Sequence, residues 1–175
     1  MRRRTLLLGS LLALALALAL AAPAVAGGEM PAKKDPAGFD RIKALAGEWE
    51  GKTADGKPVR LTYKVASAGS VVVETLTPPG EMDMVTVYHA DGDSILMTHY
   101  CASNNQPRMR ARVAGPNPKE LSFTYVDAAN LSTPDEGHMS GLTLTFEDAN
   151  HLSQAWTWTG PGGGKPEVFR FQRKK

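Results

Sequence analysis

The sequence predicts an all-β fold, an antiparallel up-and-down barrel of about ten strands preceded by a short helix. Apolar and polar residues alternate along most of the chain after residue 47, which is typical of half-buried strands. Turn-forming residues interrupt this alternation at short intervals. Residues 47 to 173 cover 127 positions, so ten strands leave about 13 residues for each strand and its turn, whereas eight would need about 16. Closure removes exposed sheet edges and therefore favours a barrel, with a two-sheet sandwich as the alternative.

The first 26 residues are expected to form a secretory signal peptide. They combine three arginines at positions 2–4, a Leu/Ala run at 11–22 and small residues at 24–26, which suit a cleavage site. Cleavage would remove three of the 20 Lys and Arg residues and none of the 18 Asp and Glu residues, so the formal charge changes from +2 to −1. We therefore expect a periplasmic or secreted protein with no nucleic-acid partner and no membrane span after cleavage. Arg3 and Arg4 leave twin-arginine export open beside the general route.

Two short segments separate this leader from the strands. Residues 27–35 are interpreted as a flexible tether, and residues 36–175 as one barrel domain. Asp35 is expected to cap a short helix that has Pro36 at its first position and ends at Gly47. The apolar stripe expected on this helix consists of Phe39, Ile42, Leu45 and Ala46.

Alternation assigns an inner and an outer face to the strands that follow. In the sixth strand, Met109 and Ala111 are expected inside the barrel and Arg108 and Arg110 outside. These arginines are therefore expected to face solvent rather than to form a binding surface. The ten strands are expected near residues 47–53, 58–66, 69–77, 82–90, 93–101, 107–114, 119–127, 138–147, 150–159 and 166–173.

A three-residue loop at 148–150 identifies one polar side chain inside the barrel. This loop pairs Leu144 with Gln154 and places Gln154 on an apolar inner face. A buried amide needs a partner, either another side chain or a ligand, because an unpaired polar group costs about 1–3 kcal/mol. Gln154 is thus a candidate polar handle for a bound molecule.

A second group of candidates lies on the fourth and fifth strands. A two-residue loop at 91–92 would place Tyr88 opposite Ile95 and put His99 and Cys101 on the same inner face as Tyr88. Such a face suits a small apolar or amphipathic ligand held in the barrel interior. The candidate ligand-binding residues are Tyr88, His99, Cys101, Gln154 and Trp156.

His99 and Cys101 support further interpretations. As i and i+2 on one strand they could act together as soft ligands of a metal or of haem, with Tyr100 as a further haem ligand, or simply form a buried structural pair. Cys101 is the only cysteine, so an intramolecular disulfide is excluded. An isomerase- or cyclase-like enzyme would need an acid–base pair, which is not evident because alternation leaves the orientation of Glu74 open. The sequence favours a binding protein over an enzyme.

The segment Gly47-Glu48-Trp49-Glu50-Gly51 carries a family resemblance. A Gly-x-Trp just after a short helix and before a meander of strands resembles the calycin group of lipocalin-like and fatty-acid-binding-like barrels. The resemblance covers residues 38 to 173 and is strongest to small secreted bacterial lipocalin-like proteins. It implies that Trp49 packs across the barrel floor beside an arginine of the last strands, Arg170 or Arg173.

The form Gly-x-Trp-x-Gly also resembles the nitrobindin-like haem barrels, which have ten strands. This resemblance implies haem as an alternative cofactor. The longer glycine-rich continuation of those proteins is replaced here by residues 52–54, Lys-Thr-Ala. With that departure, the expected cofactor state is none, and haem remains the alternative.

Overall fold

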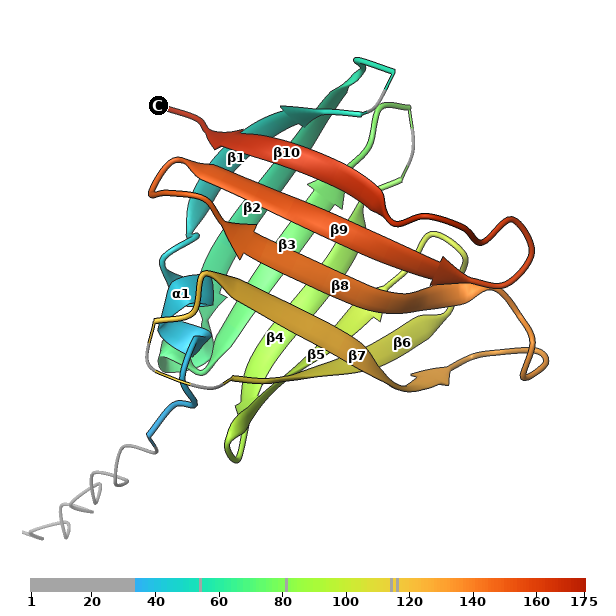
Figure 1. The fold of residues 1–175 in the computed structure, drawn as a ribbon, viewed down its shortest axis with the longest axis horizontal. Coiled ribbons are helices and arrows are strands. Elements are labelled where there is room, and N and C mark those ends of the chain that lie inside the picture. The colour runs from blue at the N-terminus through green and yellow to red at the C-terminus, as the bar shows by residue number, and fades with distance from the viewer. Residues whose placement is uncertain (1–33, 54, 81, 114, 116) are drawn as a thin grey trace, which may run out of the picture. The chain divides into compact units, whose positions relative to one another are not determined.

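A computed structural model of the protein describes residues 34–53, 55–80, 82–113, 115 and 117–175. Its strands form a closed antiparallel barrel in which each strand pairs with its neighbours in the sequence and β10 returns to β1 (Figure 1). The predicted fold class is confirmed. The expected signal peptide and most of the expected tether lie outside the described residues. Among the described residues, no helix has the length and apolar character that a membrane crossing requires.

The elements follow the expected order and differ from the expected bounds by a few residues. They are α1 (Phe39–Lys43), β1 (Gly47–Lys52), β2 (Pro58–Ala66), η1 (Ser67–Gly69), β3 (Val71–Thr77), β4 (Met84–Asp91), β5 (Ser94–Tyr100), β6 (Gln106–Arg112), β7 (Glu120–Ala129), β8 (His138–Phe146), β9 (His151–Thr159) and β10 (Glu167–Arg173).

The helix is shorter than expected. Gly38 precedes it with a left-handed φ of 86°, so the helix cannot run back to Asp35, and the prediction of Asp35 as its cap is wrong. Asp35 instead forms an ion pair with Lys43. Phe39 is buried as expected, whereas Ala46 is exposed because the helix ends three residues before it. The other two expected stripe residues, Ile42 and Leu45, are buried.

Trp49 and Arg173 close the barrel at the helix end. The Trp49 indole is 2% exposed and its Nε1 donates a hydrogen bond to the Leu45 carbonyl at 2.8 Å. The Arg173 guanidinium lies 4.3 Å from the centroid of the Trp49 ring. Arg170, the other candidate partner, is exposed on the outer wall, since residues three apart on a strand point to opposite faces. The floor arginine is therefore Arg173.

The β4–β5 hairpin has a different register from the expected one. Its turn is Gly92–Asp93 rather than Asp91–Gly92, so Tyr88 pairs with Met97 instead of Ile95. Gly92 has a φ of 62°, which the first position of a two-residue hairpin turn requires, and Asp91 stays in the ladder. The correction moves the partner by two residues and therefore leaves Tyr88 on the inner face.

Side chains fill the barrel interior from the α1 end, where Trp49 and Arg173 lie. Near the middle, the ring of His99 on β5 lies 4.6 Å from the indole of Trp156 on β9. These two strands are well separated around the barrel, so this contact crosses the interior. Two residues nearer the β4–β5 turn, Met97 pairs with both Tyr88 and Met109, and all three side chains are buried. The barrel is therefore packed at the end nearer α1, and space for a ligand lies toward the opposite end.

Candidate functional site

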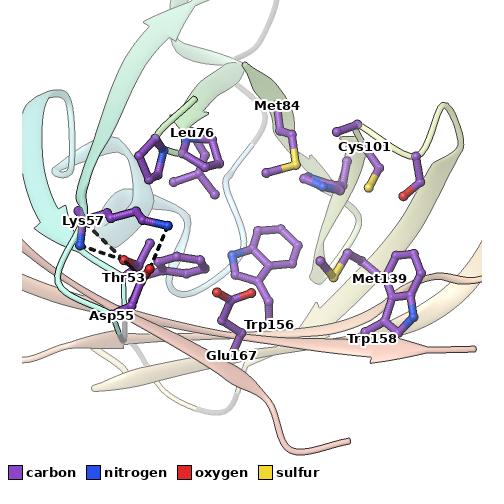
Figure 2. Close-up of a pocket in the computed structure, with 16 residues that line it drawn as sticks. Thr53, Asp55, Lys57, Leu76, Met84, Cys101, Met139, Trp156, Trp158 and Glu167 are labelled. Carbon is purple, nitrogen blue, oxygen red and sulfur yellow. Dashed lines mark hydrogen bonds and ion pairs between the residues drawn. The ribbon is translucent and has the colours of Figure 1, made fainter. Parts of the chain in front are cut away.

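A pocket of about 490 Å³ lies at the end of the barrel opposite α1 (Figure 2). It is formed by the β1–β2, β3–β4 and β5–β6 connections together with the facing ends of β8, β9 and β10. Its size lies within the range of about 300–1,000 Å³ that is typical of small-molecule sites. The lining residues are Thr53, Asp55, Lys57, Leu76, Pro78, Pro79, Met84, His99, Cys101, Ala102, Ser103, Met139, Trp156, Trp158, Glu167 and Phe169.

The wall of the pocket is largely apolar. Both of its indole N–H groups are already used within the protein: Trp156 donates to Gln154 Oε1 at 2.9 Å, and Trp158 donates to the Pro161 carbonyl at 3.2 Å. The two indoles therefore offer carbon faces rather than hydrogen bonds to a bound molecule. Phe169 on β10 adds a third aromatic ring that is 6% exposed.

Charged side chains stand at the rim of the pocket. Asp55 forms an ion pair with Lys57 at 2.8 Å, and hydrogen bonds from Lys57 and Thr53 lower the pKa of Asp55 to about 2. Glu167 lies on the pocket side opposite Met84, and Figure 2 shows its carboxylate beside Trp156. The rim thus combines charges of both signs above an apolar wall.

His99 is the deepest polar residue that lines the pocket. It is 1% exposed, and its Nδ1 lies 3.0 Å from Thr86 Oγ1 on the paired strand β4. Its Nε2 is buried and has no hydrogen-bond partner among the described residues. Burial lowers the pKa of His99 to about 4, so the imidazole is neutral at neutral pH. The ring is anchored through one nitrogen and leaves the other available.

A buried hydrogen-bond network lies behind the pocket. Glu74 is fully buried, and its Oε2 accepts hydrogen bonds from the Tyr88 hydroxyl at 2.8 Å and from Gln154 Nε2 at 3.0 Å. Gln154 Nε2 also donates to the Tyr63 hydroxyl at 2.8 Å. Burial raises the pKa of Glu74, although the surrounding hydrogen bonds oppose this rise. The polar atoms of Gln154 are therefore all used by the protein.

The structure separates the predicted site residues into two groups. His99, Cys101 and Trp156 line the pocket. Tyr88 and Gln154 lie deeper, and their polar atoms are bonded within the network. As predicted, Gln154 pairs with Leu144 and is buried, and its partners are side chains.

Other contributors were left open by the sequence or were missed. The orientation of Glu74 was left open, and the structure places it inward, on the same face of β3 as the buried Val72 and Leu76. Tyr63 on β2 was missed as a hydrogen-bond partner of Gln154. Glu167 and Met139 lie near the open ends of their strands, where alternation alone does not indicate a pocket.

No model of a known protein family matches the chain, and no curated protein matches it. The closed barrel of ten antiparallel strands is compatible with a calycin-like barrel. The likeness to that group is therefore one of architecture and of the Gly-x-Trp segment.

Proposed function

We propose that the protein is an exported carrier or sensor that holds a small apolar or amphipathic molecule in the open-end pocket. The observation that carries this proposal is the buried Nε2 of His99, which has no hydrogen-bond partner among the described residues and lies in a pocket that Trp156 and Trp158 also line. A buried polar atom without a partner costs about 1–3 kcal/mol, and a ligand that bonds to it would recover that cost. The neutral imidazole suits an uncharged hydrogen-bonding group.

The arrangement of the pocket suggests how such a molecule would lie. Its apolar body would contact the carbon faces of Trp156 and Trp158, whose N–H groups are already bonded. Its polar end would lie either at His99 or at the rim near Glu167 and Lys57. Tyr88 and Gln154, whose polar atoms are occupied, would act by holding the floor of the pocket.

Titration with the neutral fluorescent probe N-phenyl-1-naphthylamine tests the proposal. Saturable binding of one probe per chain is expected, with energy transfer from tryptophan. Met139→Asp would place a charge in the apolar wall and should weaken binding at least tenfold. Met82→Asp is the matched control, because Met82 is 70% exposed and does not line the pocket.

Far-ultraviolet circular dichroism and denaturant midpoints establish whether each variant is folded. If Met139→Asp does not fold, Trp158→Ala provides a second test, with an expected loss of affinity because one aromatic face is removed. Absence of saturable probe binding to the parent protein, or equal affinities of the Met139→Asp and Met82→Asp variants, would overturn the proposal.

Haem binding is the second candidate, and the anchoring of His99 favours it. Metal-ligating histidines commonly bind a second group through the nitrogen that does not touch the metal, as Nδ1 does here with Thr86. Titration with haemin should then give a sharp Soret band that His99→Ala abolishes. A Soret spectrum unchanged by His99→Ala would exclude this role for His99.

A further inference from the structure

Three sulfur-bearing side chains gather in the same pocket as His99. Met84 lies at the start of β4, Cys101 directly follows β5, and Met139 lies on β8. Figure 2 shows these three on the side of the pocket away from Asp55 and Lys57. The pocket therefore has a polar side with charged groups and a second side rich in soft donor atoms.

Strand register explains why these donors come together. Thr86 pairs with His99, and the ladder ends with Val85 and Tyr100. Extending this register by one residue past the ladder would place Met84 opposite Cys101. Directly opposed residues on antiparallel strands have Cβ atoms about 4.5–5.5 Å apart. Cys101 follows His99 by two residues, just past the end of β5, and both residues line the pocket; an extended chain would separate them by about 7 Å. Met and Cys side chains can close such gaps around one ion, since Met has three rotatable bonds.

We propose that His99 Nε2, Cys101 Sγ and Met84 Sδ bind one monovalent copper ion, with Met139 Sδ as a fourth ligand. Thiolate and thioether sulfur select Cu(I) among biological metals, and imidazole is compatible with it. No group of three or more His, Cys, Asp or Glu side chains in the described part of the chain could hold a metal ion. Thioether sulfur is not among the usual ligands of zinc, magnesium or calcium, so a site built from two thioethers, one thiol and one imidazole favours Cu(I).

The surroundings of His99 support this role. Nδ1 of His99 lies 3.0 Å from Thr86 Oγ1, which fixes the ring. The residue is 1% exposed, and its Nε2 has no hydrogen-bond partner in the described part of the chain. Cys101 is the free thiol of the described chain and is half-buried beside it. On binding, the Cys101 thiol gives its proton to solvent and its sulfur forms the bond to Cu(I), so one proton is released per ion and no oxidant or reductant is consumed.

This inference and the proposed binding of an apolar molecule both use the pocket and His99 Nε2, but separate experiments test them. Probe binding to the metal-free protein tests the carrier function alone. Copper binding tests the donor cluster alone, because it needs no apolar ligand. Failure of one therefore leaves the other standing.

Anaerobic titration with Cu(I), in competition with bicinchoninate, tests the site. The expected result is one ion per chain, with affinity for Cu(I) at least 100-fold higher than for Zn²⁺. Cys101→Ser should lower the Cu(I) affinity at least 100-fold and Met84→Leu about tenfold. Met82→Leu is the matched control, since Met82 is exposed outside the pocket, and should leave the affinity unchanged.

X-ray absorption at the copper edge supplies a readout of the ligands themselves. Sulfur and imidazole scatterers together are expected, with one sulfur lost in Met84→Leu. Met and Leu have similar volumes, so this variant should fold normally. A stoichiometry other than one, equal affinities of the parent and Met84→Leu, or a ligand shell of oxygen and nitrogen would each overturn the proposal.

Discussion

Lowering the pH should destabilise the metal-free protein through His99, and His99→Gln should remove that part of the loss. Burial lowers the pKa of His99 from 6.5 to about 4. Between these values the unfolded chain binds a proton that the folded protein does not, so the stabilisation is complete above about pH 6.5 and declines as the pH falls. The loss from His99 is about 1.4 kcal/mol at pH 5.5 and about 3 kcal/mol at pH 4.

Urea unfolding followed by tryptophan fluorescence, in the presence of a chelator, measures this loss. Free energies of unfolding are compared for the parent and His99→Gln at pH 4, 5.5 and 7. Glutamine keeps a hydrogen-bonding group beside Thr86 but does not titrate. Other groups titrate equally in both proteins, so the difference between the two proteins isolates His99. That difference should change by about 3 kcal/mol in favour of the variant from pH 7 to pH 4.

The exposed His151 provides the control for removing a histidine at all. His151→Gln should keep the acid sensitivity of the parent to within about 1 kcal/mol, because its partner Asp148 forms a surface ion pair with it. A constant difference between the parent and His99→Gln across the pH range would refute the reasoning. It would mean that His99 is not desolvated in the folded protein.

Three further predictions concern the barrel scaffold, and each is measured by thermal or urea unfolding. Burial raises the pKa of Glu74, so the stabilisation that its protonated form gives to the fold is present at acid pH and is lost as the pH rises. The free energy of unfolding of Glu74→Gln should therefore increase relative to that of the parent from about pH 4.5 upward. A relative free energy that decreases over this range would contradict the prediction. Gly51→Ala would place a Cβ 2.5 Å from the Arg170 carbonyl oxygen, which would push β1 away from β10 and should lower the free energy of unfolding by about 1–3 kcal/mol. An unchanged unfolding midpoint would show that the two strands can separate without cost. Arg173→Lys keeps the charge but loses the planar group over Trp49, with an expected cost of about 1–2 kcal/mol that Arg170→Lys should not reproduce.

Strand order and the β8–β9 hairpin could be predicted because their signals are local. The alternation and the turn residues lie within a few positions of each other. The three-residue loop at 148–150 fixes the register of this hairpin, and the structure has the pairing of Leu144 with Gln154 that this register predicts. The β4–β5 register could not be settled in this way, since Gly92 can stand first or second in a two-residue turn. Asp91 remains in the ladder, and its carboxylate binds Arg110 on β6 at 2.7 Å, a contact between residues far apart in the sequence.

The site was predictable only to the level of which side chains point inward. The alternation of inward and outward side chains identified His99 and Trp156 as inward residues. Their contact across the interior separates the packed core from the pocket, and it depends on closure of the barrel, which brings distant strands together. The hydrogen-bond network around Glu74 could not be predicted from the sequence either, because the hydrogen bond between Glu74 and Gln154 joins residues 80 positions apart. Burial of a carboxyl is acceptable there only because distant strands supply its donors.

The claim that ligands enter the open-end pocket beside His99 is tested most directly by methyl NMR of the protein labelled at its methionines. Met84 and Met139 line this pocket, whereas Met82 is exposed outside it and Met109 is buried elsewhere. On adding N-phenyl-1-naphthylamine or Cu(I), we predict shifts of the Met84 and Met139 methyl signals and none of the Met82 and Met109 signals. Saturable binding that leaves Met84 and Met139 unchanged would contradict the claim.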